Sequence, residues 1–201
     1  MAEPSAMEAA RRIHDEIRDG VLFGWGPHFW DETPAETLTR GRGYALTKGA
    51  ALVHRFREAG FDARLVCAEI DASILEGFME PPMPRIDHGM AEVKIADRWL
   101  CVDGFALDRP LFRAAQARLA AEGRQIGYGT HVTGSIDFPG FSQFVAAPQV
   151  RGYIWGRFDG VHDFYNQVPE AHNRTNWMAR QFFSFYTTEA NQRIDTLRAS
   201  A

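Results

Sequence analysis

Within the first sixty residues, apolar positions recur at helical spacing near the beginning and again near the end. Ser5 and Glu8 stand at the spacing of a capping box, and the apolar positions that follow recur every three or four residues up to Gly20. A second start signal, Thr33 followed by a proline, predicts a short helix that ends at the glycines of residues 41–43. Both patterns predict amphipathic helices, separated by an aromatic stretch that reads as a buried loop.

The next apolar pattern, over residues 44–59, covers more than one face and predicts a central helix that ends at Gly60. Residues 61–70 then alternate in the way a strand does. Residues 89–95 and 98–102 form two further runs around a tight turn at Ala96-Asp97, which predicts a hairpin. The order helix, helix, strand, hairpin predicts an α+β fold, in which an antiparallel sheet packs against the central helix.

The second half of the chain has weaker periodicity. Residues 111–121 are apolar and rich in alanine, and residues 175–197 carry apolar members at intervals, so each predicts a helix. Residues 124–172 are rich in Gly, His and aromatics without a clear period, and we expect loops or short strands there. No repeat and no linker divides the chain, which predicts one domain over residues 1–201.

Composition excludes several classes of function. The 201 residues carry a formal net charge of only −4, with acidic and basic residues mixed, so neither nucleic acid nor a charged partner is indicated. No apolar run reaches the length of a membrane span. The two cysteines, Cys67 and Cys101, and an N-terminal stretch without a secretory apolar core lead us to expect a cytoplasmic protein.

Two segments carry the candidate chemistry. They read GRGYALTKGAALVHRFREAGFDARLV at residues 41–66 and HGMAEVKIADRWLCVD at residues 88–103. Together they resemble the transglutaminase-like superfamily with its papain-type Cys-His-Asp site, and in particular its bacterial members. The resemblance implies a core over about residues 34–108, followed by a helical and loop extension over 109–201.

In such a site a thiolate at a helix N-terminus attacks an acyl or amide group, a histidine moves the proton, and an aspartate orients the histidine. The resemblance places the histidine at His88, the aspartate at Asp103 and the nucleophile at Ala45. The hairpin predicted between His88 and Asp103 can bring these two side chains together. Ala45 has no nucleophile, so thiol acyl transfer cannot occur there.

Three explanations fit Ala45. It is an engineered inactivating substitution, or a natural loss that leaves a peptide- or ligand-binding module. Alternatively, the site runs non-covalent acid–base chemistry, as a lyase, isomerase or cyclase on a small molecule, with His88 and Asp103 and a contribution from Tyr44 or Lys48. The expected partner is a peptide or small acyl or amide compound, and no metal or organic cofactor is implied; the oligomeric state stays open.

Other side chains are weaker candidates for the pocket. They are two residues of the central helix start, three of the upstream aromatic stretch, two of the hairpin and one histidine near the C-terminus: Tyr44, Lys48, Trp25, His28, Trp30, Trp99, Cys101 and His162. Each has an ordinary structural role as its alternative, such as core packing or a surface ion pair. The spacing of His131, His162 and His172 matches no compact zinc pattern.

Overall fold

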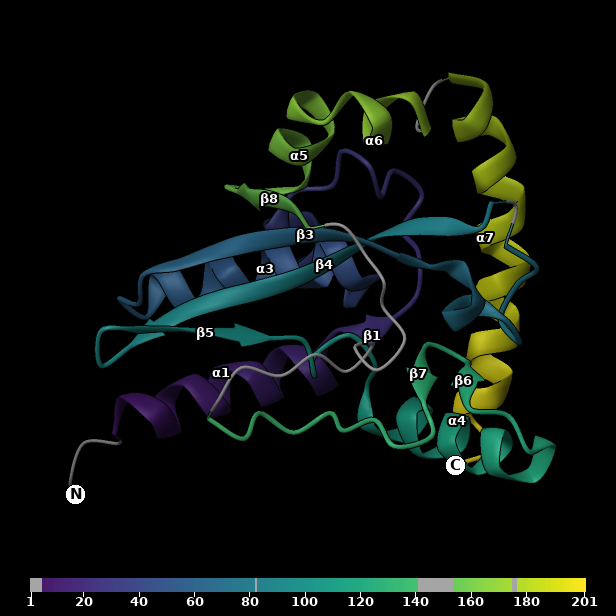
Figure 1. Cartoon of the computed structure of the whole chain (residues 1–201), viewed down its shortest axis with the longest axis horizontal. Helices are drawn as coiled ribbons and strands as arrows, with labels where there is room; N and C mark the ends of the chain where they lie inside the picture. The colour runs from purple at the N-terminus through teal and green to yellow at the C-terminus, as the bar shows by residue number, and fades with distance from the viewer. Residues whose placement is uncertain (1–4, 82, 141–153, 175–176) are drawn as a thin grey trace.

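The computed structural model describes residues 5–81, 83–140, 154–174 and 177–201. Its centre is a four-stranded antiparallel sheet in the order β5-β4-β3-β8, with the helix α3 lying along one face (Figure 1). The strands are β3 (Ala63–Asp71), β4 (Arg85–Ile95), β5 (Arg98–Val102) and β8 (Ile154–Phe158), and α3 covers Ala45–Glu58. The predicted α+β class, with a central helix on an antiparallel sheet, is confirmed.

The alternation predicted for the first strand divides its side chains between two environments. Leu65 faces α3, since a Cβ on Gly49 of that helix would lie 3.0 Å from the Leu65 side chain. Val66 points the other way and packs in a small separate cluster with Ala68, Met90 and Cys101. One face of the sheet therefore joins the main core, and the other carries this small cluster.

The hairpin of β4 and β5 turns at the predicted dipeptide. Ala96 and Asp97 have φ angles of 47° and 61°. Two successive left-handed residues define the tight turn whose twist matches that of paired strands. The register that follows pairs Ala91 with Val102, so the chain that leaves β5 runs beside the first half of β4.

The N-terminal elements form as their caps predict. α1 (Ala6–Gly20) and α2 (Pro34–Arg40) each begin with a capping box, from Ser5 and Thr33. The stretch between them is not entirely a loop, because β1 (Leu22–Phe23) pairs in parallel with β2 (Arg42–Gly43).

The C-terminal half contains more regular structure than the sequence predicted. α4 (Arg109–Glu122) and α7 (Trp177–Arg198) correspond to the two expected helices. The expectation of loops or short strands over 124–172 is confirmed by β8, a short strand that joins the main sheet. It is wrong for α5 (Val161–Gln167) and α6 (Pro169–Arg174), which are helices. Short segments with weak secondary-structure propensity take their conformation from the elements that they pack against. The remaining elements are η1 (Ala72–Leu75), β6 (Ile126–Gly127) and β7 (Thr130–His131).

The main hydrophobic core runs through both halves, from Ala10 of α1 to Ile194 of α7. The long α7, at the right of Figure 1, contacts α4 near the C-terminus. In the described part of the chain, no helix is long and apolar enough to cross a membrane.

Candidate functional site

A cavity opens beside the N-terminus of α3. Its empty volume is about 930 Å³ with the open mouth included. Ala45 of α3 and His88 of β4 both line it. Two of the three positions that the resemblance singled out therefore border one space.

Two groups of apolar side chains form most of the cavity lining. The first, which we call the aromatic wall, consists of Phe23, Trp25, Phe29, Tyr44, Tyr165 and Phe183. The second, which we call the aliphatic wall, consists of Ile70, Ile74, Leu75, Met79, Met83 and Ile86. Two ionisable side chains, Asp87 and His88, stand among these apolar groups.

His88 and Asp103 form a short, buried pair. The His88 Nε2 and Asp103 Oδ1 atoms lie 2.6 Å apart, and the two residues are 8% and 2% exposed. In the neutral ring, this carboxylate contact requires the proton on Nε2, which leaves Nδ1 as the basic nitrogen. A histidine held in one tautomer at the edge of a cavity can accept a proton from a molecule bound there.

The hairpin and a close approach between elements position this pair. Asp103 directly follows β5, whose register brings it beside His88 on β4. Gly89, the next residue, lies so close to α3 that a Cβ there would be 2.6 Å from Leu46 Cα and 2.9 Å from the Ala45 carbonyl oxygen. Only glycine permits this approach, which holds β4 against the first turn of α3.

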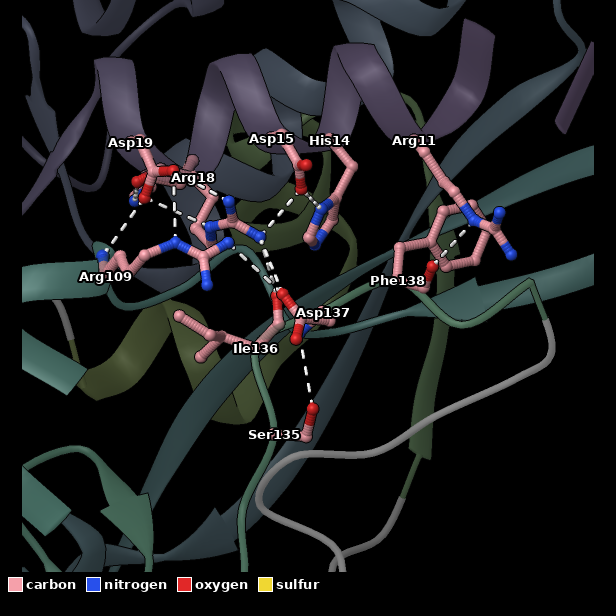
Figure 2. Close-up of polar contacts among 11 residues, drawn as sticks. Arg11, His14, Asp15, Arg18, Asp19, Arg109, Ser135, Ile136, Asp137 and Phe138 are labelled. Atoms are coloured by element: carbon pink, nitrogen blue, oxygen red, sulfur yellow. Dashed lines mark hydrogen bonds and ion pairs between the residues drawn. The ribbon is translucent and has the colours of Figure 1, made fainter. Parts of the chain in front are cut away.

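The segment around Ile136, in the C-terminal half, packs against the chain next to Asp103. A Cβ on Gly104 would lie 2.9 Å from the Ile136 carbonyl oxygen, and Ile136, Asp103 and His88 line a second, smaller cavity. The buried Arg18 of α1 donates a hydrogen bond to this carbonyl at 3.1 Å (Figure 2). The segment around Ile136 is thus held by α1 beside the pair.

Figure 2 shows the wider network around Arg18. The guanidinium contacts Asp15 and Asp19, each at 2.7 Å. Arg109 of α4 donates to Asp137 at 3.2 Å. These contacts connect α1, α4 and the segment 135–138. None of the charged residues that make them lines the cavity.

Ala45 occupies the first position of α3, a helix of 14 residues. The preceding Tyr44 is extended, and its side chain does not cap the helix; its backbone N–H donates instead to Thr47 Oγ1 at 3.1 Å. The positive end of the helix dipole therefore lies beside the cavity, where it favours negative charge. The methyl group of Ala45 supplies no chemistry of its own.

Tyr44 and Trp25, both expected near the pocket, do line it. The Tyr44 and Tyr165 hydroxyl oxygens lie 3.3 Å apart in a buried contact. Burial, and after it the proximity of Tyr165, raises the pKa of Tyr44 well above its ordinary value. The Tyr44 hydroxyl is therefore neutral at physiological pH and available for hydrogen bonding.

Lys48 is placed differently from the expectation. The sequence suggested a surface position or a place in the pocket, but Lys48 is completely buried and lines neither cavity. Its Nζ donates to the Arg18 carbonyl oxygen at 3.0 Å. Burial lowers its pKa to about 7, against the opposing effect of Asp108 and Asp19. Lys48 lies three residues after Ala45, a spacing that places both on nearly the same side of α3. The Lys48 side chain nevertheless extends to the Arg18 carbonyl and does not line the cavity.

The two hairpin candidates also lie outside both cavity linings. The Arg64 guanidinium stacks 3.9 Å from the Trp99 ring centroid, and Trp99 is 38% exposed. Cys101 contacts Met90, with 3.9 Å between the sulfur atoms. Burial and the neighbouring Asp103 raise its pKa to about 12, so it is not a substitute thiolate.

His28, Trp30 and His162 lie outside the cavity lining as well. His28 and His162 are exposed, and the His162 Nδ1 and Asp31 Oδ1 atoms lie 3.0 Å apart. Trp30 is half-buried and packs edge-on against Phe29, with 4.9 Å between ring centroids. Trp30 thus packs against Phe29, which lines the cavity, without lining the cavity itself.

Sequence reasoning missed several residues of the lining. Phe29 lies between His28 and Trp30 in the aromatic stretch, and Tyr165 lies three residues after His162, but neither Phe29 nor Tyr165 was predicted. Asp87 precedes the candidate histidine directly and was passed over. Phe183 lies on α7, far along the chain, and no local pattern connects it with the site.

No metal site is present among the described residues: no group of three or more His, Cys, Asp or Glu side chains could hold an ion. His131 instead pairs with Thr133, with 2.9 Å between Nδ1 and Oγ1. The side chain of His172 lies outside the described residues.

Comparison with known families agrees with this geometry. The family model of the transglutaminase-like superfamily matches residues 1–104, which is more than half of the chain and includes Ala45, His88 and Asp103. The chain belongs to the transglutaminase-like superfamily. Among curated proteins, no match was found.

Proposed function

We propose that this protein binds acyl or amide compounds in the cavity beside α3 and, because Ala45 stands at the nucleophile position, forms no acyl-enzyme with them. In this proposal the surroundings are those of a thiol acyltransferase or amide hydrolase. The helix start at Ala45 supplies the positive dipole, and His88 with Asp103 supplies the oriented base. The observation that carries the proposal is the 2.6 Å contact between His88 and Asp103 at the edge of a cavity that Ala45 also lines.

The restoring substitution tests this proposal. An Ala45→Cys variant, incubated with an activated acyl ester such as p-nitrophenyl butyrate, should gain one acyl group at position 45. Intact-mass measurement and peptide mapping would locate it. The native chain should gain none at Ala45, and acylation of its own thiols should be slow, because burial raises the pKa of Cys67 and Cys101.

A matched control uses the histidine. Ala45→Cys combined with His88→Ala keeps the thiol and removes the base, so acylation should fall sharply. Equal acylation in both variants would contradict a site built around His88. No acylation in either would contradict the proposal that the surroundings of Ala45 are those of a thiol acyltransferase or amide hydrolase.

A second candidate function is non-covalent acid–base catalysis on a small carbonyl compound, as in a lyase, isomerase or cyclase. The intact His88–Asp103 contact favours it, since an oriented imidazole can move protons without a neighbouring thiol. Here the native chain itself converts the compound. Conversion that is lost in His88→Ala and kept in His28→Ala, an exposed histidine outside the cavity lining, would support this function over binding alone.

A further inference from the structure

The composition of the cavity lining restricts what can bind there. Its aromatic and aliphatic walls contribute mostly apolar surface, and the two tyrosine hydroxyls in it, of Tyr44 and Tyr165, lie 3.3 Å from one another. Asp87 and His88 are adjacent on one strand. A peptide carries an N–H and a carbonyl group on nearly every residue, and each requires a partner when buried. These walls offer few such partners, so a peptide would lose hydrogen bonds on entering.

Charge restricts the ligand further. Asp87 lies in the lining close enough to Tyr44 to contribute to its raised pKa. The start of α3 favours negative charge, but only weakly. A carboxylate ligand would have to leave water and enter an apolar space next to Asp87, which costs more than the helix start contributes. A neutral amide or ester can instead place its one polar group near His88 and its hydrocarbon against the walls.

The C-terminal half supplies part of the aromatic wall. Tyr165 of α5 and Phe183 of α7 both lie outside the segment that matches the superfamily. Phe183 packs edge-on against Phe29, with 5.4 Å between ring centroids, and Phe29 packs against Tyr44 at 5.2 Å. These contacts form a continuous aromatic surface from α7 to the first turn of α3.

The same helix also fixes the neighbouring part of this wall. Asn191 of α7 accepts from the Trp25 backbone N–H at 2.9 Å and donates to the Trp25 carbonyl at 3.0 Å. Arg198 donates to the Phe23 carbonyl at 2.8 Å. α7 therefore determines where the aromatic wall lies, and an immobile wall discriminates by size more strongly than a flexible one.

We propose that the cavity takes a small neutral acyl compound, an amide or ester with an unbranched apolar chain or ring, and that Phe183 sets the longest chain accepted. This inference rests on the proposed acyl-binding function and names its ligand class. The carbonyl group lies toward His88 and Ala45, and the chain lies between the two walls.

A chain-length series tests the ligand class. Straight-chain primary amides from butanamide to octanamide would be titrated into the native chain by calorimetry, with the matching carboxylates as charged counterparts. Each added methylene should tighten binding about fourfold until the chain reaches Phe183, and each carboxylate should bind at least about tenfold more weakly than its amide. Affinity that is independent of chain length, or carboxylates that bind as tightly as amides, would overturn the inference.

A pair of variants on α7 tests the role of Phe183. Phe183→Leu should move the end of the affinity gain to a longer chain, because it shortens the wall without leaving a large void. Phe185→Leu is the matched control, since Phe185 is 74% exposed on the same helix, and it should leave the series unchanged. An unchanged series in both variants would remove Phe183 from the size limit.

Failure of this inference can be told apart from failure of the proposed function. If Ala45→Cys acquires an acyl group but the native chain shows no dependence on chain length, the acyl site stands and the ligand class is wrong. If amides bind with the expected chain dependence but Ala45→Cys stays unacylated, the ligand class stands and the acyl-transfer surroundings are wrong.

Discussion

Asp103 and Asp108 both lie in the segment that follows β5, and both are buried. Their surroundings differ. Asp103 contacts His88, whose ring lines the cavity. Asp108 lies 2.9 Å from two nitrogens of Arg198, accepts from the Phe23 backbone N–H at 3.0 Å and caps α4. Neither Asp108 nor Arg198 lines a cavity.

This difference separates a carboxylate that orients a ring facing the cavity from one whose partners are all structural. Burial alone would raise the pKa of Asp108, but hydrogen bonds from Arg198 and Phe23 outweigh it, and its pKa is lowered. The carboxylate of Asp108 thus serves to join α4, α7 and β1. Asp103 supports a ring that can still meet a ligand, so the cavity beside a buried pair, rather than burial, indicates chemistry.

The largest effect is expected from Asp108→Ala. The substitution removes a helix cap and leaves Arg198, a mostly buried cation, without its main partner. Loss of one member of such a pair costs about 3–5 kcal/mol of unfolding free energy. Chemical denaturation would measure it, with Asp195→Ala as the control; Asp195 also contacts Arg198 but is half-exposed, and its loss should cost less than about 1 kcal/mol. Equal effects from the two substitutions would contradict the structural role of Asp108.

Lys48, which lies close enough to Asp108 for the carboxylate to affect its pKa, should make the stability of the fold depend on pH. Its pKa is about 7 in the folded chain, below its ordinary value of 10.5. Between these values the unfolded chain binds a proton that the folded chain does not, so stability should rise with pH, by at most about 1.4 kcal/mol per pH unit. Below pH 7 this contribution should not vary. Denaturation from pH 6 to 10 should show a smaller rise in Lys48→Met than in the native chain, and identical slopes would contradict the burial of Lys48.

A third substitution tests the contact that brings the His88 strand to α3. Gly89→Ala would place a Cβ 2.6 Å from Leu46 Cα, and backbone atoms must shift to admit it. We expect a loss of about 1–3 kcal/mol in unfolding free energy. Gly20→Ala is the control, since a Cβ there meets nothing within 4 Å. A neutral Gly89→Ala would mean that β4 does not need this close approach.

The smallest effect on stability is expected from Asp103→Asn. Asparagine keeps an oxygen for the His88 contact, so the unfolding free energy should change by less than about 1.5 kcal/mol. The same substitution should impair the base strongly, because an amide can hold the wrong tautomer of the ring. In an Ala45→Cys background, acylation should therefore fall although the fold survives. A large loss of stability would place Asp103 with Asp108 among the structural carboxylates.

Local signals predicted the central part of the fold. The capping boxes of Ser5 and Thr33, the alternation along residues 61–70 and the Ala96-Asp97 turn each depend on neighbouring residues, and each formed as expected. The position of β8 and the helix α5 were not predicted, because both elements are short and lack a clear period. They depend on contacts with β3 and α3, and such contacts leave no local pattern.

For the candidate site, the sequence predicted the contact between His88 and Asp103, since a hairpin places its two strands side by side. It did not predict that Lys48 is buried, because a lysine on a helix is normally exposed. Phe183 could not be found from the sequence either. The packing of α7 against the core decides which face of that helix meets the cavity, and residue spacing alone does not report this.

The most direct test of the acyl-site account is the rate at which iodoacetamide labels the Ala45→Cys variant at about pH 6. An ordinary thiol with a pKa of about 8.5 is almost fully protonated there, whereas a thiol activated by a helix start and His88 is largely ionised, a difference of about a hundredfold in reactive thiolate. The account predicts fast labelling at position 45, lost when His88→Ala is added. Labelling no faster than that of Cys67 or Cys101 would contradict it, and would mean that the cavity beside α3 does not support a thiolate.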